Sequence, residues 1–303
     1  MPSEANNELA IGQDATEAGL ASHQQRLQLS KLIAADIDSY CEEAYNDGHR
    51  THLGASQIGH PCSRYLWYMF RWVKEQRNPG RSARLLNRGK REEDRFIEWL
   101  RGIGAEVWEH DTNGTQFRVK AVNGHFGGSL DCVIKLPARY NIEQPLLGEF
   151  KTNGTGKGFS DLLSKGVVLA KGQHFAQMSV YGKAYNLPYA GYFNICKNDD
   201  NLHVEVVELD FKLAAMLEYK AEEIIRSQTA PAEYALSDAV FECKYCFFQD
   251  ICRGREQPEK NCRSCSKCEP VEDGQWYCHE YNNIIPKEYI SKGCDEWMTI
   301  TQS

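Results

Sequence analysis

The stretch Leu146-Leu147-Gly148-Glu149-Phe150-Lys151 is a short apolar run that ends in a charged triplet. Its length and hydrophobicity predict a buried β-strand. Because side chains two residues apart in a strand share a face, Glu149 and Lys151 are expected to point the same way while Phe150 points into the core. A carboxylate and an ammonium group therefore stand together on one face of the predicted sheet.

A second acidic residue lies in the preceding β-prone run, where Asp131 stands within Gly128-Ser129-Leu130-Asp131-Cys132-Val133-Ile134. If the two strands pair, one face carries Asp131, Glu149 and Lys151. Two carboxylates at close range repel each other unless a hard cation lies between them, and Mg²⁺ is typically held by one or two carboxylates, waters and substrate phosphate. The lysine could then support the attacking hydroxide and the charge on the phosphate oxygens. This set predicts metal-dependent phosphodiester chemistry.

The surrounding pattern predicts an α/β chain. Short β-prone runs are separated by Asn-Gly and Gly-Gly pairs, and helical spacing of apolar residues occurs before and after them. Helices are expected at 27–45, after Cys62, and at 87–102, 172–185 and 211–225, and strands at 116–122, 128–136, 146–151, 189–196 and 203–209.

Composition excludes several classes of protein. Of 303 residues, 42% are hydrophobic and 25% are charged, as in globular proteins, so a fibrous or mostly disordered chain is excluded. No run of eighteen apolar residues exists, so we expect no membrane span, and the first ten residues, MPSEANNELA, lack the segments of a secretory signal. We therefore expect a cytoplasmic protein.

The net charge of −7 argues against a chain that coats nucleic acid over its whole surface. One segment, residues 71–95, nevertheless has a surplus of basic residues that could contact phosphates. An ordinary solvated helix face is the alternative interpretation. The basic residues are Arg71, Lys74, Arg77, Arg81, Arg84, Arg88, Lys90, Arg91 and Arg95.

Twelve cysteines are too many for a cytosolic chain without metal binding or catalysis, and eight of them lie after residue 240. Cys243, Cys246 and Cys252 provide three thiolates, one short of a tetrahedral site. Further on, Cys262, Cys265, Cys278 and Cys294 fit a small structural zinc module. Two alternatives stay open there: Cys268 could replace Cys265 or Cys294, and His279 could replace Cys278.

Together these motifs resemble the PD-(D/E)XK nuclease superfamily, in particular its RecB-like branch, which includes iron–sulfur CRISPR-associated adaptation nucleases and phage exonucleases. Asp131 matches the acidic residue of the family and Glu149-Phe150-Lys151 matches its E-x-K triplet. Gly89-Lys90-Arg91-Glu92-Glu93 places Glu93 where the branch has a helical His or Glu, with Glu92 as the rival. Gln177-Met178-Ser179-Val180-Tyr181 matches its Gln-x-x-x-Tyr helix. No proline precedes Asp131, which departs from the family pattern.

The resemblance implies a restriction-endonuclease-like αβββαβ core, here with extra helices and a cysteine-rich C-terminal metal-binding tail. It implies that Mg²⁺ or Mn²⁺ is held by the side chains of Glu93, Asp131 and Glu149 and by the carbonyl of Phe150. Lys151 would assist the chemistry. Gln177 and Tyr181 would touch DNA or steady Lys151.

A second implication concerns the cysteines. Residues 58–68, Ile-Gly-His-Pro-Cys-Ser-Arg-Tyr-Leu-Trp-Tyr, resemble the N-terminal segment of the iron–sulfur members of this branch. By that resemblance, Cys62 joins Cys243, Cys246 and Cys252 to hold a [4Fe-4S] cluster. The second cysteine group resembles a tail seen on phage nucleases of this type.

The expected organisation is a mobile extension at 1–25, a nuclease core with its cluster segment at 26–240, an iron–sulfur loop at 241–256 and a zinc-binding tail at 257–303. The expected function is a Mg/Mn-dependent DNA exonuclease that acts on single- or double-stranded ends in phage-type recombination, replication or DNA degradation. It would work in the host cytoplasm if phage-encoded, and a helicase or recombinase partner is left open. The alternatives are a catalytically inactive module that binds DNA ends and an iron–sulfur redox protein.

Overall fold

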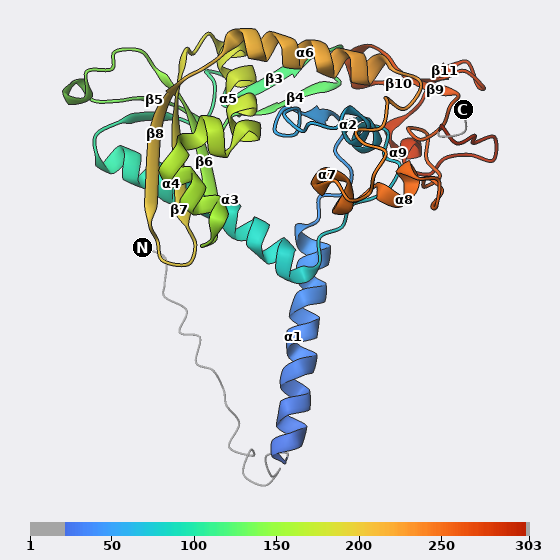
Figure 1. Ribbon diagram of the computed structural model, residues 1–303, viewed down its shortest axis with the longest axis horizontal. Coiled ribbons are helices and arrows are strands. Elements are labelled where there is room, and N and C mark those ends of the chain that lie inside the picture. Colours follow the sequence, from blue (N-terminus) through green and yellow to red (C-terminus); the bar gives the residue numbers. More distant parts are fainter. Residues whose placement is uncertain (1–21, 301–303) are drawn as a thin grey trace, which may run out of the picture. The chain divides into compact units, whose positions relative to one another are not determined.

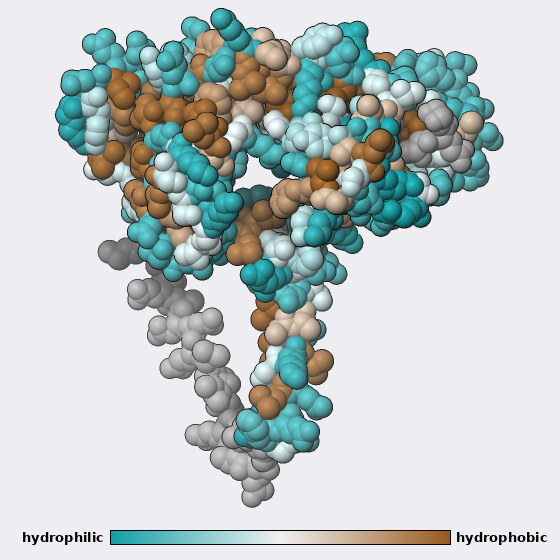
Figure 2. Space-filling view, in the orientation of Figure 1, coloured by the Kyte–Doolittle hydropathy of each residue, from teal (hydrophilic) through white to brown (hydrophobic). Residues whose placement is uncertain are grey.

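The computed structural model describes residues 22–300, which divide into two units. The described part of the first unit comprises residues 22–46 and 78–84. It contains α1 (His23–Tyr45) and the first turn of α3 (Gly80–Gly102). Within this unit, the Glu42 carboxylate accepts a hydrogen bond from the Gly80 amide at 2.8 Å. Figure 2 shows hydrophobic side chains exposed along α1.

The helix predicted at 27–45 is confirmed, and it begins earlier than expected. Ser22 and Gln25 form a capping box, in which each side chain accepts a hydrogen bond from the backbone amide of the other. Residues 22–25 of the predicted mobile extension are therefore the cap and first turn of α1. Residues 1–21 of that extension lie outside the described residues.

A five-stranded sheet dominates the second unit, and Figure 1 labels its strands β5, β6, β7 and β8. The strand order is β2-β5-β6-β7-β8. Its central strand, β6 (Leu146–Asn153), pairs antiparallel with β5 (Cys132–Lys135) and parallel with β7 (Tyr189–Cys196). The remaining strands, β2 (Glu106–Trp108) and β8 (Leu202–Glu208), join β5 and β7 in antiparallel fashion. A strand with neighbours on both edges and cover on both faces is mostly apolar, which explains Leu146, Leu147 and Phe150 in this strand.

Helices cover both faces of this sheet. On one face, Phe96 of α3 stacks on Phe150 with ring centroids 5.0 Å apart, next to Phe193 of β7. On the other face, α4 (Lys157–Ala170), α5 (Gly172–Tyr185) and α6 (Phe211–Arg226) bury their apolar sides in a core that includes Leu147. Glu149 and Lys151 share the second face with Leu147, because side chains alternate along the strand.

Smaller elements complete the second unit. A three-stranded sheet contains β1 (Leu53–Gly54), β4 (Phe126–Ser129) and β3 (Arg118–Ala121), and another contains β9 (Cys268–Pro270), β10 (Trp276–Cys278) and β11 (Asn283–Ile284). The short helices are α2 (Ser63–Phe70), α7 (Phe241–Lys244), α8 (Gln249–Cys252), α9 (Lys287–Ile290) and the 3-10 turns at Ala138–Tyr140 and Glu272–Gly274.

The predicted mixed α/β class is confirmed, and the order helix, three strands, helix, strand can be traced through α3, β2, β5, β6, α5 and β7. The predicted strand at 128–136 is two strands: β4 and β5 belong to different sheets and separate at Leu130 and Asp131. Helix α4 was not predicted. It contains Gly158 and a kink at Gly166, whose φ of 73° is not helical, so its apolar period is interrupted.

The predicted boundary at residue 257 does not separate a domain. Trp276 of β10 lies in the same core as α2, with its ring 5.4 Å from Phe70 and 5.8 Å from His125. The tail therefore completes the main core and does not depend on a small core of its own. Among residues 22–300, no helix is both long and apolar enough to cross a bilayer.

The shared core predicts the effect of removing the Trp276 ring. Trp276→Ala should lower the stability of the whole second unit by about 3–5 kcal/mol, the usual cost of truncating a buried aromatic side chain. Calorimetry should show the main transition moving to lower temperature, whereas Tyr277→Ala, whose side chain lies on the opposite face of β10, should move it less. A main transition that stays in place while a separate small one disappears would contradict the shared core.

Candidate active site

The predicted catalytic residues Asp131, Glu149 and Lys151 lie together where β5 and β6 pair. Asp131 directly precedes β5, and its Oδ2 accepts a hydrogen bond from the Phe150 amide at 2.7 Å. Glu149 is fully buried, and its Oε1 forms an ion pair with the Lys151 ammonium. The antiparallel pairing of two short strands thus brings the second carboxylate to the E-x-K triplet.

The fourth predicted residue, Glu93, comes from α3. This helix passes the end of β6, where Gly89 lies beside Thr152. The charge of Glu93 acts on both Asp131 and Lys151. Its rival Glu92 instead forms ion pairs with Arg95 at 2.6 Å and Arg88 at 3.6 Å. Glu93 is therefore the glutamate of this helix that faces the carboxylates.

The electrostatics of the cluster are those of an unbalanced acidic site. Burial, together with the charge of Asp131, raises the pKa of Glu149 to about 7 and that of Glu93 to about 7. Burial also raises the pKa of Asp131. For Lys151, burial by itself would lower the pKa, but Glu149 and Asp131 together raise it. Three carboxyl groups thus surround one ammonium group.

One oxygen of this cluster has no partner. Glu149 Oε2 is buried and makes no hydrogen bond within the described residues. An orphaned carboxylate oxygen near two further carboxyl groups fits a hard divalent cation, which binds oxygen ligands. In their present side-chain conformations, however, no three His, Cys, Asp or Glu residues in the range 22–300 form a metal-binding group. The carboxylate oxygens are thus suitable ligands for such a cation, but their side chains are not arranged around a common metal position.

Gln177 and Tyr181 lie on one face of α5, as their spacing predicts, and hydrogen-bond to each other. Both are buried, with 6% and 2% exposure, so the predicted direct contact with DNA does not fit their positions. Tyr181 instead fixes the backbone before Asp131, because its hydroxyl oxygen occupies the space that a Cβ on Gly128 would need. No hydrogen bond to Lys151 is found for Gln177 or Tyr181 among residues 22–300.

Sequence reasoning missed three polar residues beside this site. β7 places Tyr192 opposite Glu149 and Asn194 opposite Lys151. The Tyr192 hydroxyl is 2.9 Å from His174 Nδ1 on α5 and accepts a hydrogen bond from Asn194 Nδ2 at 3.2 Å. A single asparagine in an otherwise apolar strand was the available signal, because a buried amide needs partners.

The cysteines predicted to hold the iron–sulfur cluster come together in space. Cys62 caps α2, and its sulfur accepts a hydrogen bond from the Tyr65 amide at 3.3 Å. Cys62, Cys243, Cys246 and Cys252 all line one pocket. The pKa of the Cys246 thiol is raised by burial and then by the other three cysteines, which shows their proximity.

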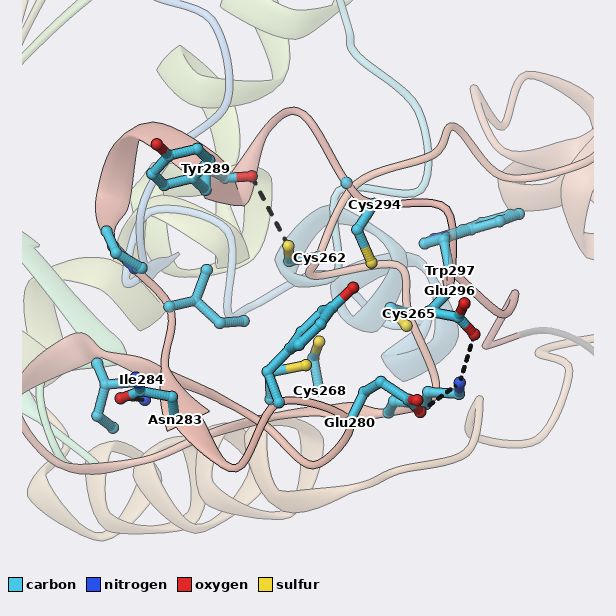
Figure 3. A pocket seen from close by; sticks show the side chains of 16 residues that line it. Cys262, Cys265, Cys268, Glu280, Asn283, Ile284, Tyr289, Cys294, Glu296 and Trp297 are labelled. Carbon is cyan, nitrogen blue, oxygen red and sulfur yellow. Dashed lines mark hydrogen bonds and ion pairs between the residues drawn. The ribbon is translucent and has the colours of Figure 1, made fainter.

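The tail cysteines line another cavity, of about 300 Å³ (Figure 3). Its lining includes all of Cys262, Cys265, Cys268, Cys278 and Cys294. Cys268 hydrogen-bonds to both Cys262 and Cys265 and lies opposite Cys278 in the β9–β10 pair. His279 is not part of the lining and forms an ion pair with Glu269 at 3.1 Å. Five cysteines thus line one cavity and His279 does not, although no three of these cysteines are arranged around a common metal position in the described residues.

The basic segment 71–95 is mostly neutralised. Arg71 is fully buried, which contradicts a role in phosphate contact. Six of the other eight side chains form ion pairs, as the alternative of a solvated helix face predicts: Lys74–Glu256, Arg77–Glu75, Arg84–Asp38, Arg88–Glu92, Lys90–Asp47 and Arg95–Glu92. The surplus read from the sequence therefore leaves little free positive charge in this segment.

Comparisons with known proteins give only distant likenesses. No family model and no curated protein matches the chain. Among solved structures, SSO0001 is 17% identical with a TM-score of 0.46, over 76% of this chain and 100% of that one. LHK-Exo in complex with dAMP is 14% identical with a TM-score of 0.42, over 57% and 86%. An alkaline exonuclease (LHK-Exo) from Laribacter hongkongensis is 13% identical with a TM-score of 0.38, over 61% and 90%. At these TM-scores the likeness assigns no function to this chain.

The environment of His174 predicts a pH-dependent stability. Burial and the charges of Lys151 and Lys171 lower its folded-state pKa to about 3. Below pH 6.5 the unfolded chain therefore binds a proton that the folded chain rejects, and stability falls by about 1.4 kcal/mol per pH unit from this group. His174→Asn should flatten the urea-unfolding profile between pH 6.5 and 5, and an unchanged slope would contradict this assignment.

Proposed function

We propose that this chain is a metal-dependent DNA nuclease of the RecB-like PD-(D/E)XK branch. The observation that carries the proposal is the fully buried Glu149 carboxylate, whose Oε2 lacks a partner beside Asp131, Glu93 and Lys151. Burying an ionisable group without full compensation is costly, and such groups concentrate at functional sites. A catalytically inactive DNA-binding module would gain nothing from keeping these like charges together.

The side chains of Glu93, Asp131 and Glu149 and the carbonyl of Phe150 would hold Mg²⁺ or Mn²⁺. The bound ion would supply Lewis-acid activation of water and of the phosphodiester. Lys151 stabilises the charge that develops on the phosphate oxygens, and it stays protonated because Glu149 and Asp131 raise its pKa. Tyr181, which hydrogen-bonds to Gln177, packs against Gly128 and so positions the backbone three residues before Asp131.

Within this class, an exonuclease that acts on DNA ends is the activity that the family resemblance favours. Its setting would be phage-type recombination, replication or DNA degradation, with a helicase or recombinase as the kind of partner. Single- and double-stranded ends are both candidate substrates.

We also propose a [4Fe-4S] cluster bound by Cys62, Cys243, Cys246 and Cys252. Support comes from their common pocket and from nearby cations: Arg64 donates to the Cys252 sulfur at 3.8 Å, and the charge of Lys220 acts on Cys62. A cluster there would close a loop of about 180 residues, and long loops lose the most unfolded-state entropy on closure.

The tail cavity is proposed to hold zinc. Buried Arg71 supports this, because its Nε and Nη1 lack hydrogen-bond partners in the described part of the chain while its charge faces Cys265, Cys268 and Glu269. A site with four thiolates around Zn²⁺ carries a net negative charge, which a buried guanidinium would balance. The expected ligands remain Cys262, Cys265, Cys278 and Cys294, with Cys268 as the competitor for the fourth position.

Loss of Lys151 or Asp131 should abolish cleavage. We expect Lys151→Ala and Asp131→Ala to lower the turnover of end-labelled linear DNA by at least about 100-fold, as removal of one stabilising group at a transition state does. Anaerobically purified protein with Mg²⁺ or Mn²⁺ should be tested on single- and double-stranded substrates. Lys135→Ala, on the exposed side of β5, is the matched control.

Unchanged turnover in either catalytic variant would overturn the assignment. If the parent protein binds DNA but cuts neither substrate, the inactive binding module becomes the better description of the chain. Retained thermal stability of both variants is needed to attribute lost turnover to the site.

Metal analysis should separate the two cysteine groups. Cys62→Ala should lose iron and acid-labile sulfide and keep zinc, whereas Cys262→Ser should lose zinc and keep iron. Comparison of zinc content in Cys268→Ser and Cys294→Ser identifies the fourth ligand, and Cys41→Ser, outside both groups, is the control. Parallel loss of both metals in every variant would contradict two independent sites.

A further inference from the structure

A separate cavity of about 520 Å³ lies against the β3–β4 hairpin. Residues of β3 and β4, Trp72, Trp276 and the α9 residues Lys287 and Ile290 line it. Positively charged side chains from three parts of the sequence line it: Arg118, Lys120, Arg263 and Lys287. Its lining contains one carboxylate, Asp273.

The cations at the rim are free, unlike those of the segment 71–95. Arg118, Lys120 and Lys287 are exposed, and none has an ion-pair partner within 4.0 Å among residues 22–300. Arg118 and Lys120 share a face because they are two apart in β3. A concave surface lined by one sign of charge concentrates its field and attracts anions.

Arg263 supplies a fixed charge behind this surface. Its guanidinium lies 4.5, 4.4 and 4.6 Å from the ring centroids of Phe70, Trp72 and Trp276, and Nη1 donates to the carbonyls of Arg50 and Thr51. Its Nε and Nη2 are buried without partners, and no carboxylate pairs with it in the described chain. The rings and carbonyls hold this guanidinium away from solvent. Because no carboxylate pairs with it, its charge is not balanced locally.

The wall beside Arg263 is strained. Trp72 has a φ of +51°, which bulky residues rarely adopt, and its ring is held by stacking on His49 and by a hydrogen bond from Nε1 to the Arg50 carbonyl. Strained residues of this kind cluster at binding sites. The pKa of neighbouring His52 is lowered by burial and then by Arg50, Arg263 and Arg118, which shows that the positive charges act on the same wall.

The cavity lies close to the proposed catalytic residues along the backbone. Ser129 lines it, and Asp131 follows two residues later, at most about 7 Å away. At a rise of about 3.4 Å per stacked nucleotide, this distance corresponds to about two nucleotides. A strand with one phosphate at Asp131 therefore has its next phosphates within reach of the cavity.

We propose that this cavity binds the phosphates of a single strand of DNA next to the phosphate that is cut. The inference rests on the proposed nuclease function and adds to it the place where the strand is held. A cavity of this volume suits a small ligand, so it fits a nucleotide or two better than a duplex. Contacts to phosphates without base readout make the binding independent of sequence.

The test is fluorescence anisotropy with a labelled oligothymidylate of about 15 nucleotides, in the absence of divalent cations and over a series of salt concentrations. Lys120→Ala/Lys287→Ala should weaken binding and reduce the salt-dependence slope by about 0.7 for each phosphate that is no longer neutralised, or about 1.4 in total. Lys31→Ala/Lys212→Ala removes the same charge from exposed positions on α1 and α6 that form no ion pair among residues 22–300, and it should leave the slope unchanged.

Equal slope changes in the two double variants would overturn the proposal. The proposal would also fail if a duplex of the same length bound more tightly and lost as much affinity in the cavity variant. Equal affinity for a labelled oligoglutamate would overturn it as well. Binding without metal is independent of cutting. If the parent protein cuts DNA and the cavity variant binds DNA normally, only the cavity proposal is refuted. If the parent protein never cuts DNA and the cavity variant loses affinity, only the nuclease proposal is refuted.

Discussion

The burial of the Glu149 carboxylate in the central strand is the constraint on which the rest of the site depends. An ionisable group in the middle of a sheet is tolerated only if neighbours supply charge and hydrogen bonds. Lys151 on the same face provides the ammonium, and the amide of Phe150 anchors Asp131. The pairing of β5 with β6 and the passage of α3 across the end of β6 are what bring Asp131 and Glu93 to it.

Buried charge that lacks a full set of partners occurs at two other positions. Arg71 and Arg263 are buried without a carboxylate ion pair in the described chain; the cysteines Cys265 and Cys268 act on the charge of Arg71, and Arg263 lines the cavity at the β3–β4 hairpin. Arg71 faces cysteines, and Arg263 backs a cationic cavity. Each of the three buried groups, Glu149, Arg71 and Arg263, lacks full pairing and lies where we propose a ligand of opposite charge. This shared property links the carboxylate cluster, the tail and the β3–β4 hairpin.

Much of the main sheet could be predicted from the sequence because its strands are short, apolar and regularly spaced. The helix at 172–185 and the strand at 189–196 match the structure, and the shared face of Glu149 and Lys151 follows from the two-residue period alone. Three features could not be read in this way. The kinked α4 lacks a continuous apolar period, the split between β4 and β5 depends on tertiary pairing, and the burial of Gln177, Tyr181 and Arg71 depends on which elements cover them.

The packing of α2 also has a consequence for folding during synthesis. Trp67 donates to the carbonyl of Ser227 across 160 residues, and Phe70 packs on Trp276 still later in the chain. At about 5–20 residues per second, the ribosome needs on the order of ten seconds or more to deliver these partners. The aromatic residues of α2 therefore lack their native partners during this time, and they present exposed apolar surface of the kind that chaperones shield.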